Sequence, residues 1–453
     1  MSAENPLIFL ACNRDGLGER LRALGNAMAL AEHFGAQFKF HWQNLREVLR
    51  DAHSILPAEE FFDPQFIADH MISDEEFEAM GDVPMVRDVP LEQIKAKLGE
   101  EGAVLSVQQP HLIYQIKGIE AEMDIDGMFP KVFARIRLAE EIEKARRAAE
   151  AVEFPPNPTA IHLRSGDIIY GMYRTMDAFH GKVVSYPIAL ELARQLAAKG
   201  ETPVIFGQDA DLTQYMKEAT GGLRVDDLSA PFGFTQTQHA VFDICMFGRC
   251  SRIFAGQSGF AILGAWLAGC KVENPARFLT PDESIACIEK TVFEGTDSPL
   301  VSGMQRAFAC RAAFVIDKRT IAEDDRWWRL LRAGRSYDPT NDFTQLVYAA
   351  SLANAGDVEE VNEVLFTMLD RLPKERGRIM AVLKNYNPHT GLVVEPYMPY
   401  LAKAAEGGSA MAALCMAVSS RALGRDEDLA KFSDMFEANA TEDEARIGKR
   451  MLA

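Results

Sequence analysis

The fold of this chain is constrained most by a regular alternation of strand-like and helical patterns between residues 159 and 268. Short apolar runs, which predict strands, are separated by longer stretches in which apolar residues recur at helical spacing. The expected strands are 159–164, 203–207 and 251–255, and the expected helices are 187–198, 236–248 and 259–268. Strands that alternate with helices form a parallel, doubly wound sheet. The sequence therefore predicts an α/β domain in this region.

The N-terminal residues carry a second pattern of the same kind. An apolar run at 7–12 predicts a buried strand, and apolar residues at three- and four-residue spacing predict a helix over 19–34. Gly35 is placed to cap that helix, because glycine adopts the left-handed conformation without strain. Alternation at 38–42 predicts a second strand. We therefore expect another α/β unit at the start of the chain.

A proline-rich segment at 154–158 is the clearest linker. Before it, residues 132–152 have the pattern of a charged connecting helix, and residues 43–130 show no regular pattern. We expect an N-terminal Rossmann-like domain at 1–155 and a second Rossmann-like domain at 156–310.

From about residue 311 the sequence changes to short amphipathic helices rich in Ala, Leu and Glu. Two helix–turn–helix segments have their glycines, Gly356 and Gly424, 68 residues apart. This is twice the period of about 34 residues in tetratricopeptide repeats. We expect a C-terminal all-α, repeat-like domain at 311–453, which acts either as a stabilising appendage or as a surface for a protein partner or for self-association.

Composition fits a globular protein and argues against several classes of function. Of 453 residues, 48% are hydrophobic, and the net charge of −18 argues against binding of nucleic acid or anionic membranes. The acidic N-terminus does not resemble a signal peptide, and no apolar stretch is long enough to span a bilayer. Seven scattered cysteines without a Cys-x-x-Cys pair indicate buried thiols in a reducing compartment. We expect a cytoplasmic protein that reaches membranes only through partners.

Charged residues gather where the strand at 159–164 ends, in the sequence His162-Leu-Arg164-Ser-Gly166-Asp167. Alternation places His162 and Arg164 on one face of the strand, and Gly166 allows a sharp turn. Arg164 would then project from the carboxyl end of a parallel strand, where open α/β sheets bind ligands. Its guanidinium suits a phosphate or diphosphate, because it donates two parallel hydrogen bonds. The alternative is a structural pair of Arg164 with Asp167 that closes the turn.

This segment resembles the His-x-Arg-x-Gly-Asp signature of the GDP-fucose-dependent fucosyltransferases, the superfamily of α1,6- and protein O-fucosyltransferases. Residues 15–24 are similar to the glycine loop and following helix of that family. Residues 254–260 are similar to its last motif, a strand that ends in Ser-x-Phe before a helix. The three motifs occur in the family's order within roughly residues 5–305. One departure is Ser165, which stands where many members have a second arginine.

The resemblance implies a GT-B fold, with two Rossmann-like domains facing a cleft. It also implies an inverting, metal-independent glycosyltransferase that uses no cofactor and takes its sugar from a GDP-sugar donor such as GDP-fucose. Arg164 would stabilise the leaving diphosphate, because negative charge grows there during transfer. His162, Gly166 and Asp167 would complete the donor-binding turn.

A helix N-terminus is expected to bind the diphosphate as well. The helix that opens at Ser258, Gly259 and Phe260 offers free backbone N–H groups, and Ser258 adds a hydroxyl donor. The alternative for Ser258 is ordinary capping of the helix.

The acceptor hydroxyl needs a base, and Asp15 is the candidate. In some protein O-fucosyltransferases a carboxylate directly before the matching glycine, here Gly16, is thought to be the base. Gly18 and Arg20 complete the N-terminal loop of the motif. The alternative for Asp15 is a turn residue that hydrogen-bonds its own backbone, and for Arg20 a salt bridge on its helix.

Asp209 and Asp211 follow the strand at 203–207 with the spacing of a metal-binding Asp-x-Asp pair. We expect them to contact the ribose or base of the donor, because the resemblance points to metal-independent enzymes. The alternative is that Asp211 caps the next helix.

Two further groups carry less information. An arginine and aromatic residues after Asp167 offer a contact surface for a sugar or guanine: Tyr170, Tyr173, Arg174 and Tyr186. His239 and Asp243 lie one helical turn apart and could form half of a metal site. A pair without a third ligand is more often a surface or capping interaction.

Two rival functions remain beside GDP-fucose transfer. One is a GT-B transferase that uses another nucleotide sugar, since Ser165 interrupts the doubled arginine. The other is a non-catalytic scaffold that binds glycans or proteins through its helical domain. The acceptor is left open between a glycan, a lipid-linked oligosaccharide and a protein hydroxyl.

Overall fold

The computed structural model describes residues 7–43, 55–171, 173–175, 177–295, 298–371, 379–384, 386–387 and 391–452. The chain packs into two compact units that interleave along the sequence. The first unit holds residues up to 163, 193–207 and 216–274, and the second holds 164–192, 208–215 and 275 onward.

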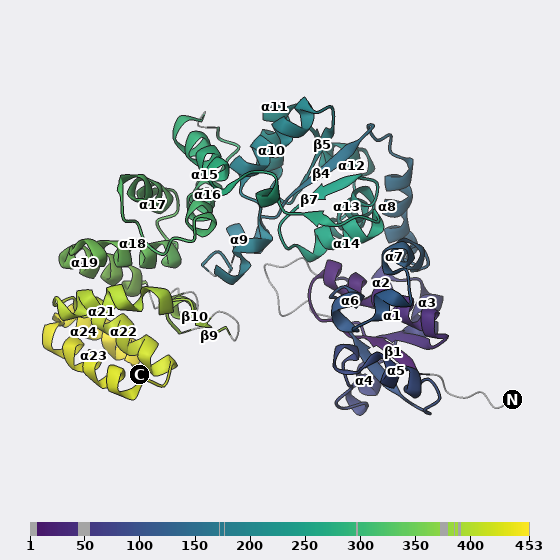
Figure 1. The fold of residues 1–453 in the computed structure, drawn as a ribbon, viewed down its shortest axis with the longest axis horizontal. Coiled ribbons are helices and arrows are strands. Elements are labelled where there is room, and N and C mark those ends of the chain that lie inside the picture. The colour runs from purple at the N-terminus through teal and green to yellow at the C-terminus, as the bar shows by residue number, and fades with distance from the viewer. Residues whose placement is uncertain are drawn as a thin grey trace. The chain divides into compact units, whose positions relative to one another are not determined.

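The first unit contains two parallel sheets (Figure 1). The smaller sheet has the strand order β2-β1-β3, and the larger has the order β6-β5-β4-β7-β8. Every neighbouring pair in both sheets is parallel. The strands are β1 (Ile8–Ala11), β2 (Gln37–Phe40), β3 (Val104–Val107), β4 (Pro158–Leu163), β5 (Thr202–Gly207), β6 (Leu223–Arg224), β7 (Arg252–Phe254) and β8 (Val272–Glu273).

Helices connect these strands, as parallel pairing requires. Those of the first unit are α1 (Leu17–Phe34), α2 (Ala58–Phe61), α3 (Pro64–His70), α4 (Asp74–Ala79), α5 (Leu91–Lys97), α6 (Leu112–Gln115), α7 (Ile125–Phe133), α8 (Glu140–Ala151), α12 (Val225–Ser229), α13 (Gln236–Phe247) and α14 (Gly259–Leu267). Two more helices, α10 (Tyr186–Ala198) and α11 (Ala210–Thr220), contain boundaries between the units.

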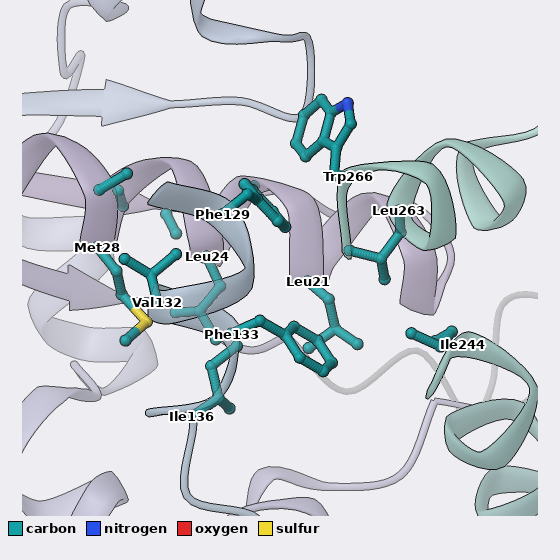
Figure 2. Close-up of a cluster of buried hydrophobic side chains, with 14 of the residues drawn as sticks. Leu21, Leu24, Met28, Phe129, Val132, Phe133, Ile136, Ile244, Leu263 and Trp266 are labelled. Carbon is teal, nitrogen blue, oxygen red and sulfur yellow. The ribbon is translucent and has the colours of Figure 1, made fainter. Parts of the chain in front are cut away.

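The core of the first unit joins its two sheets into one body. Helix α1 packs against α14 and α7, and their apolar side chains meet in the cluster of Figure 2. Close contact requires a glycine at Gly25, because a β-carbon there would lie 2.8 Å from Cε2 of Phe129. Helix α1 ends at Gly35, which adopts φ +65° and donates its N–H to carbonyls of the last turn, as predicted.

The second unit is mostly helical. Its helices are α9 (Gly166–Ile169), α15 (Pro281–Glu289), α16 (Gly303–Ile316), α17 (Asp325–Tyr337), α18 (Asp342–Ala355), α19 (Val358–Asp370), α21 (Met398–Glu406), α22 (Ala410–Ala422), α23 (Asp426–Asn439) and α24 (Glu442–Leu452). A short hairpin, β9 (Tyr386–Asn387) with β10 (Gly391–Leu392), accompanies them. Gly356 and Gly424 take positive φ between the packed pairs α18–α19 and α22–α23, which are the two predicted helix–turn–helix segments.

The predicted fold class, α/β with parallel sheets and a helical C-terminal part, is confirmed, and three details are corrected. Residues 43–130 are not irregular throughout, because β3 and several helices lie there. The helix expected at 132–152 is interrupted, because Leu138 pairs with Phe62 in an isolated β-bridge between α7 and α8. The boundary expected after residue 310 falls inside α16, a continuous helix with a buried centre.

Among the described residues, no helix is both long and apolar enough to cross a membrane.

Candidate functional site

The larger sheet has a topological switch point beside β4. The chain proceeds from β4 to β5 and β6 on one side, and then returns to β7 and β8 on the other side. Ligands of open parallel sheets bind beyond the carboxyl ends of the strands at such a point. The strand pair at this point is in register at Ile161 and Phe254. The segments that directly follow these two strands are 164–167 and 255–260, which carry two of the three predicted motifs.

Arg164 and Asp167 form the ion pair of the turn after β4. Arg164 Nη2 donates to Asp167 Oδ1 at 3.0 Å and to Oδ2 at 3.2 Å. The Nε–H of Arg164 is buried and has no hydrogen-bond partner in the described part of the chain. The pair that closes the turn is therefore present, and Arg164 still has donors available for a ligand.

Gly166 makes this turn possible. Its φ is +35°, and a β-carbon there would lie 2.6 Å from Oε1 of Gln208. Any other residue would strain the backbone and collide with Gln208, so the tight turn depends on glycine.

Both carboxylate oxygens of Asp209 accept hydrogen bonds. Its Oδ1 accepts the backbone N–H of Leu212 at 3.0 Å, and its Oδ2 accepts Nε2 of Gln305 at 3.0 Å and the hydroxyl of Tyr170. The alternative for Asp211, capping of the helix, is wrong: Asp209 caps α11 through the bond to Leu212, and Asp211 is an exposed residue of its first turn. The reason is that α11 begins at Ala210, two residues before the start that a cap at Asp211 would require.

The smaller sheet has its own switch point, between β1 and β3, and a polar cluster follows these strands. Asn13 Nδ2 donates to Gln109 Oε1 at 2.6 Å and lies 3.3 Å from Asp15 Oδ2. Asn13 Oδ1 accepts the backbone N–H of Asp15 at 2.8 Å, so the side chain that closes this turn is that of Asn13 and not that of Asp15. The carboxylate of Asp15 is nevertheless exposed, and is open to a substrate hydroxyl.

Asn13 and Gln109 were not among the predicted residues. Asn13 is the second residue after β1 and could have been noticed. Gln109 follows β3, a strand that the sequence pattern did not reveal.

Arg20 is buried, and it holds the backbone of the loop that carries Asp15. Its guanidinium donates to the carbonyl oxygens of Asp15 at 2.8 Å, Gln43 at 2.8 Å and Arg14 at 3.2 Å. Burial lowers the pKa of Arg20 to about 10. Arg20 therefore shapes the loop through the backbone, and the alternative of a helix salt bridge is not what the structure has.

The N-termini of α1 and α14 meet in the first unit. A β-carbon on Gly18 would lie 2.9 Å from Cα of Phe260, so this close approach requires a glycine at Gly18. Ser258 is fully buried, and its Oγ has no hydrogen-bond partner among the residues that the structure describes. It does not cap α14 with its side chain, contrary to the alternative considered for it.

Gly259, the first residue of α14, lies against the carboxylate of Glu19. A β-carbon on Gly259 would collide with that carboxylate. The helix N-terminus expected to receive a diphosphate is therefore faced by an acidic side chain that the sequence did not single out.

His162 is 7% exposed and packs against two aromatic side chains. Its ring contacts Phe247 edge-on at 5.7 Å and the tilted ring of Phe260 at 6.1 Å. The histidine is thus held by α13 and α14.

The other predicted groups have structural partners. Arg174 is buried 3.5 Å from Asp338, and its Nη2 donates to Oγ1 of Thr340 at 2.7 Å. Tyr186 is buried as well, whereas Tyr170 is exposed and remains beside Asp209. The aromatic cluster is therefore divided between core and surface.

His239 Nδ1 lies 3.2 Å from Ser229 Oγ, so the histidine has a hydroxyl neighbour. Within the described ranges, no group of three or more His, Cys, Asp or Glu side chains could hold a metal ion. A cavity of about 260 Å³ lies among α16, α17 and α18, and none of the predicted site residues lines it.

No protein-family profile matches the chain, and no curated protein matches it in sequence. Among solved structures, the chain is similar to the fucosyltransferase NodZ from Bradyrhizobium, with 16% identity, 58% of this chain and 93% of that chain covered, and a TM-score of 0.35. It is also similar to POFUT1 in complex with GDP-fucose, with 12% identity, coverage of 60% and 97%, and a TM-score of 0.33. A variant of Arabidopsis thaliana FUT1 in complex with GDP has 10% identity, coverage of 60% and 70%, and a TM-score of 0.39.

Proposed function

We propose that this protein is an inverting, metal-independent glycosyltransferase of the GT-B class that transfers fucose from GDP-fucose to a hydroxyl group. The observation that carries the proposal is Arg164, an arginine with unused donors directly after the central strand at the switch point of a parallel sheet. The three sequence motifs that resemble fucosyltransferases support the choice of donor.

In this proposal Arg164 stabilises the diphosphate that leaves during transfer. Preorganised donors aimed at developing charge are worth more than donors in water, because they need no reorganisation. Ser258 and the N–H groups at Gly259 supply further donors to the phosphates. Asp167 holds the guanidinium in place, and His162 lines the nucleotide site.

Asp15 is proposed as the base that takes the proton of the acceptor hydroxyl. Its carboxylate is exposed, and its backbone is fixed by Asn13 and Arg20, so it can meet an acceptor without moving the loop. The acceptor is a glycan, a lipid-linked oligosaccharide or a protein, and the C-terminal helices provide the surface for a protein partner. The proposed location is the cytoplasm.

The direct test is calorimetric titration with GDP, UDP and CMP and with their sugars, accompanied by thermal unfolding. Ligands that bind only the folded state raise its melting temperature by mass action. We expect GDP and GDP-fucose to bind and the others to bind at least tenfold more weakly, an energy difference of about 1.4 kcal/mol. Tighter binding of UDP or CMP would indicate a donor other than GDP-fucose. If no nucleotide bound, the result would favour the rival function of a non-catalytic scaffold.

Metal independence is tested separately. Because the proposal gives the charge-stabilising role to Arg164 and a helix N-terminus, transfer activity should be unchanged in excess EDTA. Inhibition by EDTA that Mn²⁺ or Mg²⁺ reverses would contradict this part of the proposal.

A further inference from the structure

A side chain of the helical region joins two loops that carry predicted donor-site residues. Gln305 lies in the first turn of α16 and is 3% exposed. Its Nε2 donates to Oγ of Ser165 at 2.9 Å and to Oδ2 of Asp209 at 3.0 Å. One amide group therefore connects the turn after β4 with the loop after β5, and both of its N–H bonds are used.

A second connection runs in parallel through Tyr170. Its hydroxyl donates to Asp209 and lies 3.0 Å from Oγ of Ser302, the N-cap of α16. Burial and the hydrogen bond to Asp209 raise the pKa of Tyr170 to about 12, so the phenol remains a donor at neutral pH. Ser302 in turn accepts the backbone N–H of Gln305 at 3.2 Å. The start of α16 is therefore tied to Asp209 by two routes.

Ser165 transmits this connection to Arg164. The serine is 1% exposed and lies directly between Arg164 and Gly166. Gly166 follows at φ +35°. The side chain of Ser165 accepts its hydrogen bond from Gln305, so Gln305 holds the residue that connects Arg164 to the turn at Gly166.

We propose that Gln305 is a positioning residue of the donor site, which holds the turn of Arg164 in fixed relation to Asp209. This inference rests on the proposed function and extends it. In the fucosyltransferase family that the sequence resembles, many members have a second arginine at this position. Here it is Ser165, which is hydrogen-bonded to Gln305 of the helical region. The helical region thus takes part in shaping the donor site.

The test uses the full-length protein with Gln305→Ala, and with Gln345→Ala as a matched control. Gln345 is also buried in the second unit, and its side chain donates to the carbonyl of Pro339 at 2.7 Å and accepts from Arg335 at 3.0 Å. Within the described residues it makes no side-chain hydrogen bond to either loop. Calorimetry should show GDP affinity reduced about tenfold by Gln305→Ala, as expected for loss of a hydrogen bond to a charged group, and unchanged by Gln345→Ala. Equal affinity in wild type and Gln305→Ala would overturn the inference.

A charge variant gives a readout that general destabilisation would not produce. In Gln305→Glu, a second carboxyl group faces Asp209, so one of the two retains its proton to a higher pH than usual. When the introduced glutamate is protonated, its O–H can donate one of the two hydrogen bonds that Gln305 makes. When it is ionised, it repels the carboxylate of Asp209. The GDP affinity of this variant relative to wild type should therefore fall as pH rises from about 5 to 8. A constant ratio would contradict the role of Gln305.

Hydrogen–deuterium exchange keeps the inference testable if no nucleotide binds to the wild-type protein. That result would defeat the proposed function, but Gln305→Ala should still speed exchange in the segments 164–171 and 208–212. Exchange in these segments should remain as in wild type for Gln345→Ala. Unchanged exchange in Gln305→Ala would show that Gln305 does not hold the two loops.

Discussion

The carboxylate of Glu19 packs against Gly259, the first residue of α14. Glu19 itself lies in the first turn of α1, so its carboxylate is close to the N-termini of two helices, α1 and α14. A carboxylate is favourable at a helix N-terminus, because it faces the positive end of the helix dipole. It also competes with any other anion that approaches the same place.

Glu19→Gln should therefore have opposite effects on ligand binding and on stability. Removal of the charge should tighten GDP binding by about two- to fivefold and lower the free energy of unfolding by about 0.3–1 kcal/mol. Calorimetry and urea denaturation measure the two quantities. Glu32→Gln, near the other end of α1, is the control for affinity. Weaker GDP binding in Glu19→Gln would show that the carboxylate takes part in binding.

Arg164→Lys should lose most of the transfer activity, by a factor of about 10²–10³, while the fold is retained. Lysine keeps the charge but cannot donate two parallel hydrogen bonds to a phosphate. Steady-state kinetics with GDP-fucose measure the effect, and circular dichroism checks the fold. Arg326→Lys is the control, because Arg326 makes a two-point ion pair with Glu289 on the surface. Near-normal turnover by Arg164→Lys would exclude the two-point phosphate contact.

Asp15→Asn should reduce kcat by a factor of about 10²–10⁴ and leave GDP affinity unchanged, because the amide fills the same space but cannot accept a proton. The backbone of the loop should persist, since Arg20 and Asn13 hold it through main-chain atoms. Asp82→Asn changes another exposed carboxylate of the first unit, one outside the predicted site, and should have little effect on kcat. If Asp15→Asn retained full turnover, the base would have to be another group.

Three buried thiols should be unreactive in the folded protein. Burial raises the pKa of Cys250, Cys310 and Cys415 to about 12 each, so almost none of the reactive thiolate exists at pH 8. In the folded protein a colorimetric thiol reagent should therefore leave these three thiols unmodified. After denaturation it should modify all seven cysteines. Fast modification of Cys415 in the native protein would show that the C-terminal helices open readily.

The same shifts set the pH dependence of stability. Thiols that ionise near pH 9 in the unfolded chain keep their protons in the folded protein up to about pH 12. Between these values the folded state binds more protons, so stability should fall as pH rises from about 9 to 12. Urea denaturation at several alkaline pH values measures this decline, and a flat profile would contradict the burial of these thiols.

The local sequence pattern was sufficient to predict the long helices. It did not reveal elements that are defined by contacts with distant parts of the chain. The helix α1 and its cap Gly35 were predictable, because spacing and a left-handed glycine are encoded within a few residues. The strand β3 is defined by its pairing with β1, which lies far earlier in the chain, and no regular pattern around 104–107 marks it.

The candidate site divides in the same way. Arg164, Gly166 and Asp167 form one turn, and their spacing alone indicated it. Gln305 and Glu19 reach their partners across 140 and 240 residues, and nothing in the neighbouring sequence marks them. Asp209 caps α11 in place of Asp211, because the helix begins two residues earlier than a cap at Asp211 would require.

The order in which the chain visits its two units affects how this protein can be dissected. The path changes unit after residues 163, 192, 207, 215 and 274, and two of these changes fall within helices. Neither unit is encoded by one continuous stretch of the gene. No single cut of the chain therefore separates the two units, and neither unit can be transferred alone as one gene segment. Substitution of individual residues, such as Gln305 or Glu19, can separate their contributions where truncation cannot.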